Sequence, residues 1–293
     1  MSNKQPITPA MKFSICSTGL KGMNLKEVLE AAARLQLDGV ELWDGHLEAY
    51  LDSGGTPAEL RRYLTEHRLG VPAISTYASF SQSQEAWGSD PRTIQRAARR
   101  AAELDCPRIR TFAGHLPSRE ADRLIWNRVG SGLSEASKAC AAHGVRLAIE
   151  MHNNTLADTV ESIATLLESG GPELELIFDG FNFFVDRLDP LPVLTQFYPR
   201  ITHVHFKNYK WNRQDWAQSV PVPVLQGDSD HCAILRKLAE LEYDGFVSFE
   251  YFGDQVLELT RLSCLEVTKE LSGGGAIVLE PECGGNRSKR PGG

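Results

Sequence analysis

The feature that most constrains the fold is an alternation, repeated eight times, of a short apolar segment and a longer segment with helical periodicity. The short segments are rich in Val, Ile, Leu and Phe, which is typical of strands buried on both faces. Each is followed by a predicted helix before the next begins. The predicted strands are 12–16, 39–43, 71–75, 108–112, 147–153, 174–179, 201–207 and 246–250.

The helix starts between these strands are marked by capping residues. Asn24 precedes an apolar stripe with Glu27 three residues on, and Thr56-Pro57 is followed by Glu59, so both sites predict a capping box. Eight strand and helix pairs predict a single (β/α)8 TIM barrel of the α/β class over residues 12–271. A doubly wound open sheet is less favoured because no Gly-x-Gly-x-x-Gly turn follows the first strand. The predicted helices begin near 24, 56, 90, 118, 158, 192, 230 and 255.

The ends and the composition of the chain set its class. Residues 1–11 form a polar leader without an apolar signal core, and the glycine-rich segment 272–293 is predicted to be a disordered tail. The net charge of −7 argues against nucleic acid or an anionic membrane as partner. The six cysteines are scattered without a Cys-x-x-Cys pair, as expected for free thiols. These features predict a soluble, cytoplasmic protein.

Four predicted strands end in a charged or imidazole side chain: Glu150, Asp179, His205 and Glu250. In a (β/α)8 barrel the carboxyl ends of all strands meet at the catalytic face. Three carboxylates and one imidazole suit Mn²⁺ best, with Co²⁺, Mg²⁺ or Zn²⁺ also possible. We therefore expect one divalent metal ion that keeps positions open for substrate oxygens.

Such a site predicts chemistry next to a carbonyl. A cation that holds a carbonyl and the neighbouring hydroxyl acidifies the C–H bond between them by stabilising an enediolate. Glu150 and Glu250 come from different strands, so one can take the proton and the other return it from the opposite face. The sequence thus predicts a metal-dependent isomerase or epimerase of a sugar, keto-sugar or cyclitol, with these two glutamates as ligands and catalytic residues.

Other residues near the strand ends have two interpretations each. Asp179 could also cap the turn that follows it, and His203 lies one layer deeper than His205, where a packed, hydrogen-bonded histidine is expected. Four polar residues could contact substrate or only line the solvated rim: Glu41, His46, Arg110 and His115. Five aromatic residues could stack on a sugar ring or only pack within the protein: Trp43, Phe183, Phe184, Trp211 and Trp216.

Several motifs at these strand ends occur together: Ala148-Ile-Glu150-x-His152-Asn153, Phe178-Asp179-x-x-Asn182, His203-Val-His205-Phe-Lys207-Asn208, Gly227-Asp228-Ser-Asp230 and the stretch 243–251. The combination resembles the xylose isomerase-like superfamily, in particular its sugar phosphate isomerase/epimerase branch, over most of residues 12–270. The resemblance implies metal ligands at the four residues named above. It also implies contacts to substrate hydroxyls from His152, Asn182 and Lys207.

Two features depart from the family pattern. Asn208 stands where the family frequently has an aspartate, which we expect to remove a charge near the rim. The segment 208–228 is an insertion rich in aromatic residues, including Trp211, and we expect it to reshape the pocket as a lid or a contact surface. Barrels of this type often dimerise, so a homo-oligomer, either dimer or tetramer, is expected.

Three alternatives to the isomerase remain. The same proton abstraction followed by loss of a β-substituent would make the protein a lyase, either a dehydratase or an enzyme that cleaves C-glycosides of an oxidised sugar. A related abasic-site endonuclease needs many more histidines than the eight present and a basic surface. A non-catalytic binding subunit is disfavoured by the intact four-ligand set.

Overall fold

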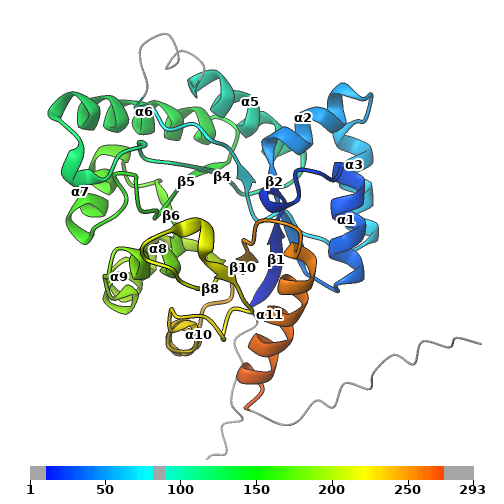
Figure 1. The fold of residues 1–293 in the computed structure, drawn as a ribbon. Coiled ribbons are helices and arrows are strands. Elements are labelled where there is room, and N and C mark those ends of the chain that lie inside the picture. Colours follow the sequence, from blue (N-terminus) through cyan, green and yellow to red (C-terminus); the bar gives the residue numbers. More distant parts are fainter. Residues whose placement is uncertain (1–10, 82–89, 274–293) are drawn as a thin grey trace, which may run out of the picture.

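The computed structural model describes residues 11–81 and 90–273, and within them eight parallel strands close into a barrel in the order β1-β10-β7-β6-β5-β4-β3-β2. Helices surround this barrel on the outside (Figure 1). The predicted single (β/α)8 barrel is therefore confirmed. Its strands are β1 Lys12–Cys16, β2 Gly39–Trp43, β3 Ile74–Ser75, β4 Arg108–Thr111, β5 Arg146–Glu150, β6 Glu175–Asp179, β7 Ile201–Phe206 and β10 Phe246–Phe249.

The helices run back along the outside of the barrel and begin at its catalytic end. The two predicted capping boxes are present, since the side chains of Asn24 and Thr56 each accept a hydrogen bond from the backbone of the glutamate three residues on. None of the helices in the described part of the chain is long and apolar enough to cross a membrane. The longer helices are α1 Leu25–Arg34, α2 Asp44–Asp52, α3 Pro57–Glu66, α5 Asp90–Glu103, α6 Arg123–Ala141, α7 Val160–Gly170, α9 Pro190–Phe197, α10 His231–Glu240 and α11 Val256–Leu271.

Some element bounds differ from the prediction. Helix α2 was not predicted, because it follows β2 without a side-chain cap and has only a weak apolar stripe. The six-residue helix α8, Gly180–Val185, is too short to show a period. The helix predicted from 118 begins at Arg123, where Asp122 caps it. Strand β5 ends at Glu150 rather than continuing to 153.

The interior of the barrel contains a layer of hydrogen-bonded polar side chains below the strand ends. Ser14 Oγ lies 2.6 Å from Ser248 Oγ, Ser248 Oγ lies 3.0 Å from His203 Nε2, and His203 Nε2 lies 2.8 Å from Glu41 Oε2. All four side chains are buried, and the strand residues between them pack outward against the helices. This is the alternation expected of strands, and it turns polar side chains of different strands toward one another.

The insertion after β7 contains two further short strands, β8 Tyr209–Lys210 and β9 Val220–Pro221, which pair antiparallel. The short helical turn Trp216–Gln218 lies between them. This ribbon stands over the barrel mouth (Figure 1). Almost all of the predicted leader 1–11 and tail 272–293 lies outside the described residues.

Candidate metal centre and substrate pocket

The four predicted ligands meet at the carboxyl ends of the strands. One donor atom from each of Glu150, Asp179, His205 and Glu250 lies within 4.8 Å of the other three, and all four side chains are buried. Glu150 and Asp179 are the last residues of β5 and β6, His205 is in β7, and Glu250 directly follows β10. The parallel register of the barrel therefore brings together residues that are up to 100 positions apart.

Backbone contacts hold two of these carboxylates in place. The Glu250 backbone N–H donates to the Phe206 carbonyl at 3.0 Å, which extends the β10–β7 pairing to the ligand itself. Asp179 Oδ1 accepts from the Phe181 N–H at 3.0 Å and caps helix α8, while Oδ2 faces the centre. The two interpretations of Asp179 are thus compatible, because each uses a different oxygen.

His205 is oriented by a carboxylate on its far side. Its Nε2 lies 2.8 Å from Glu41 Oε2, and its Nδ1 lies 3.7 Å from both Glu150 Oε2 and Glu250 Oε2. With a metal ion in place of the Nδ1 proton, a proton held on Nε2 by Glu41 would leave the Nδ1 lone pair directed at the ion, as in carboxylate–histidine–metal arrangements. Burial alone would lower the pKa of His205, but the surrounding Glu41, Glu250 and Glu150 raise it well above its usual value.

Glu41 lies below the pocket and does not line it. Its Oε2 also lies 2.8 Å from His203 Nε2 and accepts from Cys16 Sγ at 3.2 Å, while its Oε1 accepts from Ser75 Oγ. Burial would raise the pKa of this carboxyl, but His205 and His203 hold it well below its usual range. The structure therefore places Glu41 as a support for His205, in contrast to the predicted substrate contact.

Two cations balance the carboxylates. The Arg110 guanidinium donates from Nε and Nη2 to Glu150 Oε2, and its Nη2 lies 3.8 Å from Glu250 Oε1. Lys207 Nζ lies 2.7 Å from both Asp179 Oδ2 and Glu250 Oε2. Burial would raise the pKa of Glu150, but Arg110 and His205 hold it well below its usual range, whereas burial raises the pKa of Asp179 despite Lys207.

Two ligand atoms at this centre have neither a hydrogen bond nor a close ion pair and suit a metal ion. Within the described part of the chain these are the buried Glu150 Oε1 and His205 Nδ1, while Asp179 Oδ2, which also lacks a hydrogen bond, pairs with Lys207. Burying a polar atom without a partner costs about 1–3 kcal/mol, and a coordinated cation would remove that cost. Three carboxylates and one imidazole form a donor set that fits a divalent first-row metal or Mg²⁺.

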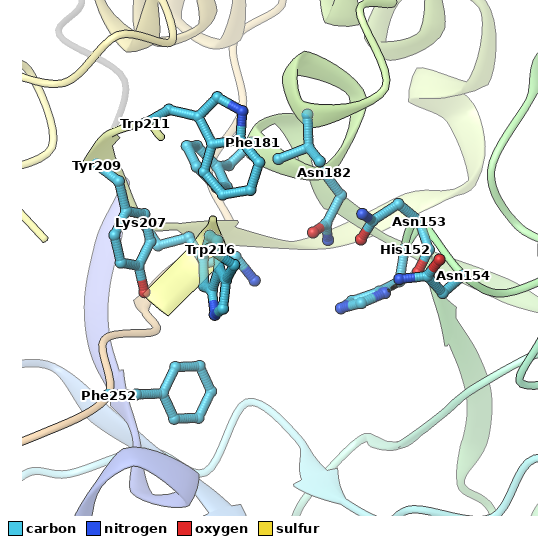
Figure 2. A pocket seen from close by; sticks show the side chains of 11 residues that line it. His152, Asn153, Asn154, Phe181, Asn182, Lys207, Tyr209, Trp211, Trp216 and Phe252 are labelled. Carbon is cyan, nitrogen blue, oxygen red and sulfur yellow. Dashed lines mark hydrogen bonds between the residues drawn. The ribbon is translucent and has the colours of Figure 1, made fainter. Parts of the chain in front are cut away.

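A cavity of about 380 Å³ opens beside this centre, and its walls differ in character. Figure 2 shows amide and imidazole side chains on one side and aromatic side chains on the other. The Asn182 Nδ2 donates to the Met151 carbonyl at 3.2 Å, which fixes the orientation of its amide. The lining residues are His152, Asn153, Asn154, Phe181, Asn182, Val185, Lys207, Tyr209, Trp211, Trp216 and Phe252.

Four of the six predicted substrate contacts lie in this cavity: His152, Asn182, Lys207 and Trp211. Glu41 lies below it, and the exposed His115 bonds Ser81 Oγ through its Nδ1 and does not line it. Sequence reasoning missed Asn154 and Phe252, which lie in loops just past β5 and β10, and Phe181 and Val185, which lie in α8 directly after β6. Their position shortly after a predicted strand end was the available signal.

Residues 29–271 match the xylose isomerase-like TIM barrel family. The chain belongs to this family. The predicted resemblance is therefore confirmed at the level of the superfamily.

Two proteins with similar sequences are named as dehydratases. A 3-dehydroshikimate dehydratase of Bacillus anthracis is 24% identical over 270 residues, which cover 86% of this chain and 94% of that protein. An inosose dehydratase of Salmonella typhimurium is 34% identical over 138 residues, but this match covers only 43% of this chain and 46% of the relative. These relatives support an enzyme and favour the predicted lyase alternative over an isomerase or epimerase.

Solved structures share the fold at lower identity. A probable 3-DHS dehydratase from Bacillus anthracis has a TM-score of 0.80 at 23% identity, over 88% of this chain and 99% of that one. The IOLI protein with a bound zinc atom has a TM-score of 0.73 at 20% identity, over 89% and 96%. An L-ribulose 3-epimerase has a TM-score of 0.73 at 19% identity, over 90% and 95%. At these identities the likeness shows the fold alone.

Proposed function

We propose that this protein is a divalent-metal-dependent lyase that removes water from a hydroxylated ketone, such as a keto-sugar or a keto-cyclitol. The observation that carries the proposal is the buried cluster of Glu150, Asp179, His205 and Glu250, in which three ligand atoms lack hydrogen-bond partners. The choice of a lyase over the predicted isomerase or epimerase is supported by the two relatives named as dehydratases.

The metal would be held by those four side chains, and Mn²⁺ is the ion we propose for them. When bound, it would stabilise the negative charge that develops on the substrate's carbonyl oxygen. Glu41 would keep the Nε2 proton of His205 in place, so that the Nδ1 atom of His205 stays available to ligate the metal. Arg110 and Lys207 limit the repulsion among the carboxylates through the ion pairs described above.

The acid–base work falls to residues of the centre and the pocket. Glu150 or Glu250 takes the proton from the carbon next to the carbonyl, and the electron pair of that C–H bond is delocalised toward the carbonyl oxygen. The pair then forms the new carbon–carbon double bond as the β-hydroxyl leaves with a proton, so that one water molecule is released. His152 is our candidate for the residue that donates this proton to the leaving hydroxyl, because its ring points toward the cavity (Figure 2).

The pocket residues would hold the ring of the substrate. Asn182 and Lys207 both line the cavity, and Lys207 also reaches the centre, so we propose that they bind hydroxyl groups of the substrate. Trp211 lies on the aromatic wall, which suits the apolar C–H face of a hydroxylated ring. We propose these three residues, together with His152, as substrate contacts.

The product mass tests the reaction type. Protein stripped with a chelator and reloaded with Mn²⁺ should convert an inosose or 3-dehydroshikimate into a product lighter by one water, while E250Q should not. A product of unchanged mass would show an isomerase or epimerase. No conversion of either compound with Mn²⁺, Co²⁺, Mg²⁺ or Zn²⁺, despite measured metal binding, would contradict both reactions on these substrates.

The isomerase or epimerase remains the second candidate because two carboxylates, Glu150 and Glu250, reach the same centre from β5 and from the end of β10. Such a pair can remove a proton from one face and return it to the other without elimination. Elimination would then require a β-substituent that can leave and a residue that donates a proton to it. Without these, the proton would be returned and the substrate would be isomerised or epimerised. A homo-oligomeric state and a cytoplasmic location stay predictions.

A further inference from the structure

Asn208 occupies a position that neither the metal centre nor the proposed chemistry uses. It follows Lys207, its side chain is fully buried, and it lies under the insertion that forms part of the pocket. We propose that Asn208 is a positioning residue that fastens the 209–229 segment, so that Tyr209, Trp211 and Trp216 are held as one wall of the substrate pocket.

The side-chain amide of Asn208 uses its full hydrogen-bonding capacity. Its Nδ2 donates to the Val224 carbonyl at 2.7 Å and to the Ser229 carbonyl at 2.8 Å. Its Oδ1 accepts from the Tyr209 N–H at 2.9 Å and from the Ser229 N–H at 3.2 Å. One side chain therefore joins the start, the late part and the end of the segment.

Neighbouring contacts close the same junction. The Val222 N–H donates to the Asn208 carbonyl at 3.1 Å, and the Asp228 N–H donates to the Tyr209 carbonyl at 2.9 Å. Gly227 packs directly on the amide, since a Cβ built there would lie 2.0 Å from Asn208 Cγ. A larger residue at 227 would thus push the two ends of the segment apart.

The fastened segment carries the aromatic wall. Trp211 and Trp216 have ring centroids 4.8 Å apart, Tyr209 and Trp216 5.0 Å, and Phe181 lies 5.1 Å from Tyr209. Phe181 belongs to helix α8 of the barrel, so it anchors the wall from outside the segment. Trp216 is half exposed toward the cavity mouth, and its place there depends on the segment that carries it.

This placement changes the meaning of the departure noted in the sequence. Asn208 was expected to remove a charge near the rim, but its side chain is buried and its nitrogen faces two carbonyl oxygens. An aspartate here would place a carboxylate oxygen against those carbonyls and would lose two buried hydrogen bonds. The remaining neighbour of that oxygen would be His231 Nδ1, which lies 3.2 Å from Asn208 Nδ2. The structure places residue 208 in a buried junction, where the amide donates to two carbonyl oxygens that a carboxylate could not serve.

The segment offers a matched control at Asn212. Asn212 Oδ1 accepts from the backbone of Gln214 and Asp215, and its Nδ2 donates only to the exposed Gln218 side chain at 3.2 Å. The change N212D therefore keeps the backbone contacts and loses one surface bond. N208D makes the same chemical change at the buried junction.

Limited proteolysis tests the fastening without a substrate. The segment contains the exposed trypsin sites Lys210 and Arg213, and cleavage there requires local opening. We expect N208D to be cut at these sites at least about tenfold faster than wild type or N212D, because opening no longer breaks the two bonds to Val224 and Ser229. The tryptophan emission of N208D should shift to longer wavelength as Trp211 and Trp216 gain water contact.

The outcomes decide the proposal. Cleavage of N208D at the wild-type rate, or equally fast cleavage of N212D, would overturn it. If N208D does not fold, G227A tests the same junction by steric pressure, and the same tenfold acceleration is expected.

The role of Asn208 in the pocket rests on the proposed function. With a substrate that the wild type converts, the KM of N208D should rise about tenfold while its kcat stays within about threefold. An unchanged KM with a reduced kcat would contradict it, whereas absence of all turnover would count against the proposed function and leave the proteolysis decisive for the fastening.

Discussion

The two halves of the barrel contribute differently to the same centre. All four candidate ligands come from the second half, on β5, β6, β7 and the end of β10. The first half contributes Glu41 from β2 and Arg110 from β4, which bond the ligands His205 and Glu150. The second half thus supplies the candidate donors together with Lys207, which pairs with Asp179 and Glu250. The first half supplies Glu41, which orients His205, and Arg110, which neutralises Glu150.

The difference shows how a closed barrel can separate these two tasks. The interior is narrow enough for side chains of facing strands to touch, so Glu41 reaches His205 although the two residues are 164 positions apart. Loss of a donor should then remove the metal itself. Loss of a support, Glu41 or Arg110, should change the affinity of the site for the metal or the stability of the metal-free protein.

The largest effect is expected from removing a donor. E250Q keeps the size of the side chain but removes a negative ligand and one member of the acid–base pair, and it leaves Lys207 with a single carboxylate. We expect kcat/KM to fall by about 10⁴-fold or more, because a ligand and a general base are lost together. Metal content measured after dialysis should fall in parallel.

If E250Q retains both its metal and near-normal turnover, the assignment of the donors to the second half is wrong. If it retains its metal but loses turnover, Glu250 acts on the proton alone, and three ligands suffice. The metal analysis and the kinetics must therefore be made on the same preparation.

A smaller effect is expected from the neutralising support. R110M leaves Glu150 without its guanidinium partner in a fully buried position. Breaking a buried ion pair in this way should destabilise the metal-free protein by about 3 kcal/mol. Excess Mn²⁺ should restore most of that stability, because the cation would sit among the same carboxylates. Urea unfolding of R110M with and without Mn²⁺ measures both values.

Arg108 provides the control for this variant. It lies on the same strand but pairs with Glu175, at 2.9 Å, toward the opposite end of the barrel. R108M should lose stability equally with and without Mn²⁺. An equal metal response in R108M and R110M would show that Arg110 has no special relation to the metal centre.

The fold and the donors could be predicted because both leave local marks in the sequence. The strand period, the capping boxes at Asn24 and Thr56, and an acid or imidazole at a strand end are all visible within a few residues. Strand alternation also placed His203 below His205, and the structure bonds it to Glu41 and Ser248.

The supports could not be predicted because their partners are distant in the chain. Glu41 sits near a strand end like the ligands, and only the closure of the barrel shows that it faces His205. His115 also follows a strand, but its imidazole hydrogen-bonds Ser81 and does not line the cavity. The role of Asn208 depends on its contact with Ser229, 21 residues further along the chain, which no local sequence pattern predicts.

The smallest effect is expected from the orienting support. E41Q retains one oxygen that can accept from His205 Nε2, but it removes the charge that holds this proton and must still serve His203. Metal affinity should fall by about tenfold, at the low end for such outer partners, as measured by isothermal titration with Mn²⁺. The control is E175Q, whose carboxylate pairs with Arg108 away from the centre and should leave the affinity unchanged. Since all four ligands stay in place, kcat at saturating Mn²⁺ should change less than the affinity does. A loss as large as that of E250Q would mean that Glu41 belongs among the donors, and the division between the two halves of the barrel would not hold.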